Sequence, residues 1–163
     1  MNSCFLSEAD RYVFGQGNHY EIYKKLGAHI VNEGKKQGVY FAVWAPNAAY
    51  VSVVGDFNQW NGYEGVMRRL EPLGIFETFL PNVKLGDLYK FQITTKTGEV
   101  LYKADPFGNS AEYRPGTASV IADLSTIKWT DDEWIKKREK IDIKEEPFAI
   151  YECHIGSWMK HPN

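Results

Sequence analysis

The sequence contains only two cysteines among 163 residues, and they stand near opposite ends of the chain, at Cys4 and Cys153. They form no Cys-x-x-Cys pair and have no spacing typical of a metal site. A disulfide-rich framework, on which many small secreted domains depend, is therefore excluded. We expect two reduced thiols in a cytosolic protein.

Targeting and membrane signals are also missing. The first ten residues carry neither a basic region nor an apolar stretch of signal-peptide length. No segment approaches the roughly 18 apolar residues that a membrane-spanning helix needs. The sequence therefore predicts a cytoplasmic protein without a membrane partner.

The chain has no large excess of charge of either sign. Its formal net charge is -2, and it has no long basic block. The densest basic stretch, at 136–138, is flanked by Glu133 and Glu139, as expected for a solvated helix face. Nucleic acid is therefore not expected as a partner.

The residue types of a catalytic centre are not grouped anywhere in the chain. The four histidines are scattered without a serine or cysteine motif, and no glycine-rich phosphate loop is present. His154 lies near Glu152 in a terminal apolar segment, where it fits either a functional group at a strand end or a structural histidine. We predict no catalytic residue, no metal ligand and no cofactor for this chain.

Aromatic residues, by contrast, are abundant. The chain has 5 Trp, 10 Tyr and 9 Phe. They supply a large buried core and leave some aromatic faces for contact with a ligand.

From Gly38 to about Asp123, apolar and polar residues alternate with the period of a β-strand. Turn residues separate short runs of this kind, which predicts a mainly β fold, an antiparallel immunoglobulin-like β-sandwich. We assign residues 35–124 to the sandwich and residues 1–34 to an N-terminal preamble. The expected strands are 38–45, 51–55, 75–80, 88–95, 100–103 and 118–121.

A helical linker is expected at 125–147. Thr130-Asp-Asp-Glu133 has the pattern of a capping box, in which a side chain at each end satisfies a backbone N–H of the other. This pattern predicts a short helix from Asp131 to about Glu139.

The last segment, 148–163, begins with an apolar run that predicts a strand from Phe148 to Ile155. A single strand with unpaired edges is unfavourable. We therefore expect this strand to be the opening element of a further domain, whose other strands are missing.

The best candidate for a binding residue is Trp60, in the segment Val54-Gly-Asp-Phe-Asn-Gln-Trp-Asn61. It follows a turn rather than an alternating apolar set, so it either offers an exposed aromatic plate to a sugar ring or plugs the edge of the sandwich. Lys90 points away from its core-facing neighbours, toward either a ligand or solvent. Tyr102 either covers the core or extends the same surface.

Several motifs together resemble a known family, the glycogen-binding β-sandwich called carbohydrate-binding module family 48, which also occurs in the β-subunit of AMP-activated protein kinase. These motifs are Gly55-Asp-Phe-Asn-Gln-Trp60, Leu88-Tyr-Lys-Phe91, Ala104-Asp-Pro106 and Arg114-Pro-Gly-Thr117. The flanking motifs are similar to those of bacterial glycogen branching enzymes. They are His19-Tyr-Glu-Ile-Tyr-Lys-Lys-Leu-Gly-Ala-His29, Phe41-Ala-Val-Trp-Ala-Pro-Asn47 and Ile150-Tyr-Glu-Cys-His-Ile-Gly-Ser-Trp158.

The resemblance implies a sugar platform of Trp60, Lys90 and Tyr102, with Thr117 and Ser119 as further candidates. Tyr102 stands where the kinase module has a tryptophan. The implied partner is an α-1,4-glucan such as glycogen or a maltooligosaccharide, together with the missing catalytic barrel of the same protein.

The resemblance also implies that the full enzyme transfers α-1,4-glucan segments to 6-hydroxyls, making α-1,6 branches by a retaining glycosidase-type mechanism. The carboxylates of that mechanism belong to an α-amylase-type (β/α)8 barrel, and the resemblance implies that the segment 148–163 is the truncated start of this barrel, with Phe148 to Ile155 as its first strand. Only 16 residues follow position 147, whereas such a barrel needs roughly 250, so this chain alone is expected to be non-catalytic. Two alternatives are a stand-alone glycogen-binding scaffold protein and a module of a debranching enzyme, and the Lys-Leu-Gly-Ala-His element at 25–29 argues against the second.

Overall fold

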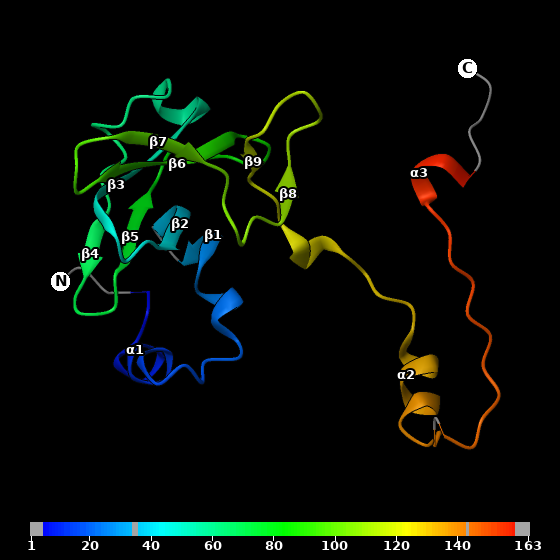
Figure 1. Cartoon of the computed structure of the whole chain (residues 1–163). Helices are drawn as coiled ribbons and strands as arrows, with labels where there is room; N and C mark the ends of the chain where they lie inside the picture. The colour runs from blue at the N-terminus through cyan, green and yellow to red at the C-terminus, as the bar shows by residue number, and fades with distance from the viewer. Residues whose placement is uncertain (1–4, 34–35, 143, 159–163) are drawn as a thin grey trace. The chain divides into compact units, whose positions relative to one another are not determined.

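A computed structural model describes residues 5–33, 36–142 and 144–158 of the chain (Figure 1). The chain divides into two compact units, residues 1–126 and 127–163. Each unit is described by itself.

The first unit contains a four-stranded antiparallel sheet with the strand order β1-β2-β5-β4. Its strands are β1 (Gly27–Glu33), β2 (Lys36–Trp44), β4 (Arg68–Leu70) and β5 (Ile75–Leu80). In β2, Val39, Phe41 and Val43 face one side of the sheet, as the alternation of the sequence predicted. This sheet forms the middle layer of the unit.

A second antiparallel sheet has the strand order β3-β6-β9-β8, and β7 also pairs with β6. Its strands are β3 (Ala48–Gly55), β6 (Leu88–Thr95), β7 (Val100–Lys103), β8 (Ser110–Ala111) and β9 (Ser119–Val120). The central strand β6 is therefore flanked by β3 along one edge and by β7 and β9 along the other.

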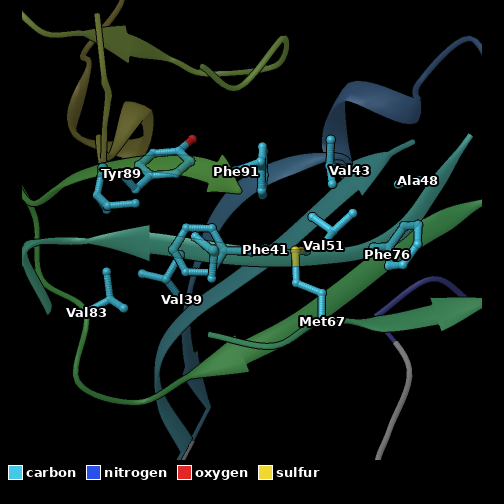
Figure 2. Close-up of a cluster of buried hydrophobic side chains, with 12 residues drawn as sticks. Val39, Phe41, Val43, Ala48, Val51, Met67, Phe76, Val83, Tyr89 and Phe91 are labelled. Carbon is cyan, nitrogen blue, oxygen red and sulfur yellow. The ribbon is translucent and has the colours of Figure 1, made fainter. Parts of the chain in front are cut away.

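The main hydrophobic core lies between the two sheets (Figure 2). Phe41 of the first sheet meets Tyr89 of the second edge to face, with ring centroids 5.2 Å apart, and Phe91 packs against Tyr89 in the same manner at 6.0 Å. Each such aromatic pair contributes about 0.5–1.5 kcal/mol beyond the burial of its area. The prediction of a mainly β, antiparallel sandwich is confirmed.

A second hydrophobic cluster lies on the other face of the first sheet, where the N-terminal segment covers it. Leu6 and Leu26 are buried there against Ala42, Leu70 and Ile75. The helix α1 (Glu8–Gly15) and the 3-10 turn η1 (Ile22–Lys24) belong to this layer, and Figure 1 shows α1 on the side of the first sheet away from β6 and β7. The N-terminal segment is thus a third layer of the unit.

The structure differs from the sequence prediction at the start of the sandwich. The first sheet begins with β1, which pairs with β2 from Gly27↔Ala42 to Glu33↔Lys36, whereas the predicted sandwich began at residue 35. The preamble also contains α1, which the prediction missed. Its start was readable in the sequence, because Ser7 and Asp10 form a capping box in which the Ser7 hydroxyl accepts a hydrogen bond from the Asp10 N–H.

The second unit contains the helix α2 (Asp132–Arg138), close to the predicted bounds of Asp131 to Glu139. The predicted capping box is wrong. Asp131 rather than Thr130 is the N-cap residue, and its side chain makes no capping hydrogen bond. A short 3-10 turn, η3 (Leu124–Thr126), ends the first unit.

The strand predicted from Phe148 to Ile155 is not formed. Residues 148–154 have no regular secondary structure, and a helical turn, α3 (Ile155–Trp158), follows them. A strand is stable only when its backbone N–H and C=O groups pair with a neighbour, and the described residues of this unit include no other strand. The rest of the predicted segment, 159–163, lies outside the described residues.

Candidate functional site

The outward face of the second sheet carries most of the residues that the sequence singled out. Because Tyr89 and Phe91 of β6 point into the core, the adjacent residues Lys90 and Gln92 point the other way. Gln92 lies directly across from Tyr102 of β7 in the strand register. Lys90 and Tyr102 therefore share one face of the sheet.

Trp60 lies in the loop that follows β3, and this loop begins where Val54 lies across from Lys90. The 3-10 turn η2 (Asp56–Asn58) opens the loop, and the buried Asn58 side chain ties it to β3. The Asn58 side-chain oxygen accepts from the Gly55 N–H at 2.9 Å, and its Nδ2 donates to the Val53 carbonyl at 3.0 Å. The Trp60 backbone N–H donates to the Gly55 carbonyl at 2.9 Å, which closes the turn at the end of the strand.

The loop holds its backbone in an unfavourable conformation. Gln59 and Trp60 have φ angles of 52° and 61°, and no other non-glycine residue in the described part of the chain has a positive φ. The left-handed region costs roughly 1–2 kcal/mol for such a residue. Strain of this kind persists where the surrounding structure enforces it and is common at ligand-binding sites.

The Trp60 side chain is 38% exposed, and its Nε1–H donates to Asp56 Oδ1 at 3.2 Å. It is therefore neither free in solvent nor part of either buried cluster. Further along the loop, Gly62 lies against Gln92, because a β-carbon at position 62 would be 2.0 Å from Gln92 Oε1. The loop thus reaches the middle of the outward face.

Lys90 lies across from Val54 at the end of the sheet where the Trp60 loop begins. Its Nζ donates to Thr117 Oγ1 at 2.6 Å. Thr117 lies in the turn between β8 and β9, where Glu112 accepts a hydrogen bond from the Ala118 N–H at 3.1 Å. The structure therefore joins Lys90 and Thr117, although 27 residues separate them in sequence.

Tyr102 is 53% exposed on the neighbouring strand. Of the two readings that the sequence left open, extension of the exposed surface fits this position, since the ring is not among the buried core residues. We call Trp60, Lys90, Gln92, Tyr102 and Thr117 the outer-face cluster. Gln92 was not among the candidates that the sequence indicated.

Ser119 differs from the other candidates, because it is buried. It is only 3% exposed, and its hydroxyl accepts from the Asp105 N–H at 2.9 Å. Asp105 in turn accepts from the Tyr89 hydroxyl at 2.6 Å. The structure places Ser119 in this internal network rather than in the outer-face cluster.

The same network shifts the ionisation of its members. Burial raises the pKa of Asp105 above its ordinary value of 3.8, more than the hydrogen bonds from Tyr89 and the Phe107 N–H lower it. Burial also raises the pKa of the Tyr89 hydroxyl, and the neighbouring Asp105 adds to the shift. These groups lie buried at the junction of β6 with β9.

The three histidines within the described residues are in contact with different segments. His19 Nε2 lies 3.0 Å from Asp10 Oδ1 in the N-terminal layer, and His29 Nε2 lies 2.9 Å from the Leu26 carbonyl oxygen. His154 contacts the Ser157 hydroxyl in the second unit. Among the residues described here, no three His, Cys, Asp or Glu side chains are placed to hold a metal ion.

The outer-face cluster combines flat aromatic surface with donors and acceptors. An indole or phenol face covers the apolar side of a pyranose ring, and ammonium, amide and hydroxyl groups can form hydrogen bonds with the hydroxyls at its rim.

No helix within the described ranges has the length and apolarity to cross a bilayer. Cys153 is free and exposed, and Cys4 lies outside the described residues.

The fold defines the chain's first unit as an antiparallel β-sandwich module. Residues 25–108, about half of the chain, match the sequence pattern of carbohydrate-binding module 48 (isoamylase N-terminal domain). The chain belongs to this family.

Curated relatives with the name 1,4-alpha-glucan branching enzyme GlgB are similar over nearly the whole chain. The relative from Butyrivibrio fibrisolvens is 56% identical over 98% of this chain. Those from Synechococcus sp. (strain JA-3-3Ab) and Marinobacter nauticus are 49% and 44% identical over 94% and 99%. The chain spans 25%, 20% and 26% of the lengths of these three relatives.

Two solved structures show the same fold over about two thirds of this chain. The catalytic module of the pneumococcal glycogen-degrading virulence factor SpuA has a TM-score of 0.52 at 22% identity, covering 66% of this chain and 17% of that one. PulA from Klebsiella oxytoca has a TM-score of 0.51 at 24% identity, covering 62% of this chain and 10% of that one. At these identities the likeness shows the fold alone.

Proposed function

We propose that this chain is the N-terminal glucan-binding and supporting part of a 1,4-α-glucan branching enzyme. The parent enzyme would transfer α-1,4-glucan segments to 6-hydroxyls, by the retaining mechanism in which one carboxylate is the nucleophile and a second carboxyl group is the acid and base. The identity to curated branching enzymes supports this choice over a debranching enzyme or a stand-alone scaffold. We also propose that the protein is located in the cytoplasm. Its partner would be the remainder of the parent protein, including the catalytic barrel.

The outer-face cluster would bind an α-1,4-glucan such as glycogen or a maltooligosaccharide. The observation that carries this proposal is the partly exposed Trp60 ring, held at its Nε1 edge, at the end of the sheet where Lys90 meets Thr117. Trp60 and Tyr102 would stack on sugar rings, and Lys90, Gln92 and Thr117 would bond hydroxyls. Ser119 is left out of the proposed contacts because its side chain is inside.

Affinity electrophoresis in gels that contain glycogen tests this proposal. We expect the wild-type chain to be retarded and the Trp60→Ala variant to lose affinity by about tenfold or more, since a buried aromatic contact is worth about 2 kcal/mol when truncated. Trp129→Ala is the matched control, because Trp129 is an exposed tryptophan in the other unit. Circular dichroism establishes that each variant is folded.

Three outcomes decide between the possibilities. Retardation that is lost in folded Trp60→Ala and kept in Trp129→Ala supports the cluster as the glucan site. Equal losses in both variants mean that Trp60 has no special role. A wild-type chain that migrates freely contradicts glucan binding by this part of the protein.

A further inference from the structure

Asp56 bridges two parts of the proposed site that are far apart in sequence. Its Oδ1 accepts from the Trp60 Nε1–H at 3.2 Å, and its Oδ2 accepts from the Leu88 backbone N–H at 2.9 Å. Leu88 is the first residue of β6, and Lys90 follows two residues later. One carboxylate thus connects the indole ring to the strand that carries the lysine.

Both oxygens of Asp56 are engaged within the protein, so this carboxylate is already committed to holding the loop. The Trp60 backbone lies in the left-handed region, and the ring belongs to neither buried cluster. Without a fixed point at its edge, the indole could rotate about its side-chain bonds and cover or leave the sheet face. The hydrogen bond from Nε1 supplies that fixed point.

Resting on the glucan-binding function proposed above, we propose that Asp56 is a positioning residue for the site. It holds the Trp60 indole by its nitrogen edge, so that the ring is pre-oriented to stack on a pyranose, and it does not itself contact the sugar. Pre-orientation raises affinity because the side chain has less freedom to lose when the ligand binds.

The first experiment is glycogen affinity electrophoresis of Asp56→Ala. We expect affinity to fall by roughly threefold to tenfold, the loss appropriate to one side chain that must be ordered on binding. Asp123→Ala is the matched control, since Asp123 is also an aspartate that accepts from a backbone N–H, that of Ser125 at 2.8 Å, but lies outside the cluster. Unchanged affinity of folded Asp56→Ala would overturn the inference.

A double-mutant comparison separates positioning from direct contact. Trp60→Phe keeps an aromatic face but has no N–H for Asp56 to hold. In this background we expect Asp56→Ala to cause little further loss of affinity. A loss as large as in the wild type would mean that Asp56 contacts the sugar itself, and the inference would be wrong.

A measurement without glucan covers two remaining outcomes, a misfolded Asp56→Ala variant and a wild type that does not bind. Protein labelled with 5-fluorotryptophan gives one fluorine signal for each tryptophan, and Trp60→Phe assigns the signal of Trp60. We expect Asp56→Leu, which is close in size to aspartate but has no acceptor oxygen, to shift and broaden this signal alone. An unchanged signal in a folded variant overturns the positioning role even if the wild type binds glycogen. If the Trp60 signal shifts in the variant but the wild type migrates freely in glycogen gels, glucan binding is refuted, whereas the hydrogen bond between Asp56 and Trp60 is supported.

Discussion

At the scale of single residues, adjacent side chains of β6 point to opposite faces of the sheet and take part in two different polar contacts, one inside the core and one on the surface. Tyr89 points into the core and Lys90 away from it, and each finds a partner on a distant segment, Asp105 and Thr117 respectively. The internal pair contributes to stability, because a buried carboxyl group needs its hydrogen bonds. The external pair shapes the surface where we propose that glucan binds.

A pH-dependent contribution to stability belongs to Asp105. Because its pKa in the folded protein lies above the ordinary value of 3.8, the folded state binds the proton more tightly than the unfolded state. The stabilising effect is therefore complete below that ordinary value and is lost as the pH rises through the raised pKa. We expect the free energy of unfolding of the wild type, minus that of Asp105→Asn, to decrease from about pH 4 upward in urea titrations.

Asp123→Asn serves as the control for this prediction. Hydrogen bonds from Ser125 lower the pKa of the Asp123 carboxyl group, so its contribution is already complete above the ordinary pKa and changes only in acid. A difference between wild type and Asp105→Asn that stays constant or grows with pH would contradict the prediction.

At the scale of elements, the N-terminal segment is the part of the fold that the sequence pattern described least well. The pattern showed no long apolar periodicity before Gly27, yet Leu6 is completely buried and anchors α1 on the first sheet. The helix itself buries no residue. Its position is therefore set by the residues on both sides of it, which only the tertiary structure reveals.

Leu6→Ala is expected to weaken this layer strongly. Removing a fully buried leucine side chain costs about 2–5 kcal/mol, since a cavity remains among Leu26, Leu70 and Ile75. Val13→Ala, on the partly exposed surface of α1, is the matched control and should cost much less. Urea unfolding measures both, and equal small losses would show that the N-terminal layer is not part of the cooperative fold.

At the scale of the whole molecule, the two units differ in how they bury apolar residues. Both hydrophobic clusters, both sheets and the outer-face cluster belong to residues 1–126. The second unit leaves many large apolar side chains exposed, namely Ile127, Trp129, Trp134, Phe148, Ile150, Tyr151, Ile155 and Trp158. Exposed apolar residues in such number are typical of a surface that binds another protein or the same one.

A chain of residues 1–126 should therefore keep the fold and the binding of the whole. We expect it to have the same urea midpoint and the same retardation by glycogen as the 163-residue chain, and to self-associate less in sedimentation velocity experiments. Loss of its cooperative unfolding transition would show that the first unit depends on the second.

The alternation of apolar and polar residues predicted correctly that Phe41, Tyr89 and Phe91 lie in the core of an antiparallel sandwich. The local sequence is sufficient for this, because successive side chains on a strand point to opposite faces by covalent geometry. It also indicated Trp60, Lys90 and Tyr102 through their motifs. Which of these candidates lie near one another could be seen only in the folded chain. Ser119 turns inward and Thr117 outward within one short segment, and Asp56 reaches Leu88 across 32 residues. Such contacts depend on how strands and loops are paired, and that pairing is not encoded in the local period of the chain.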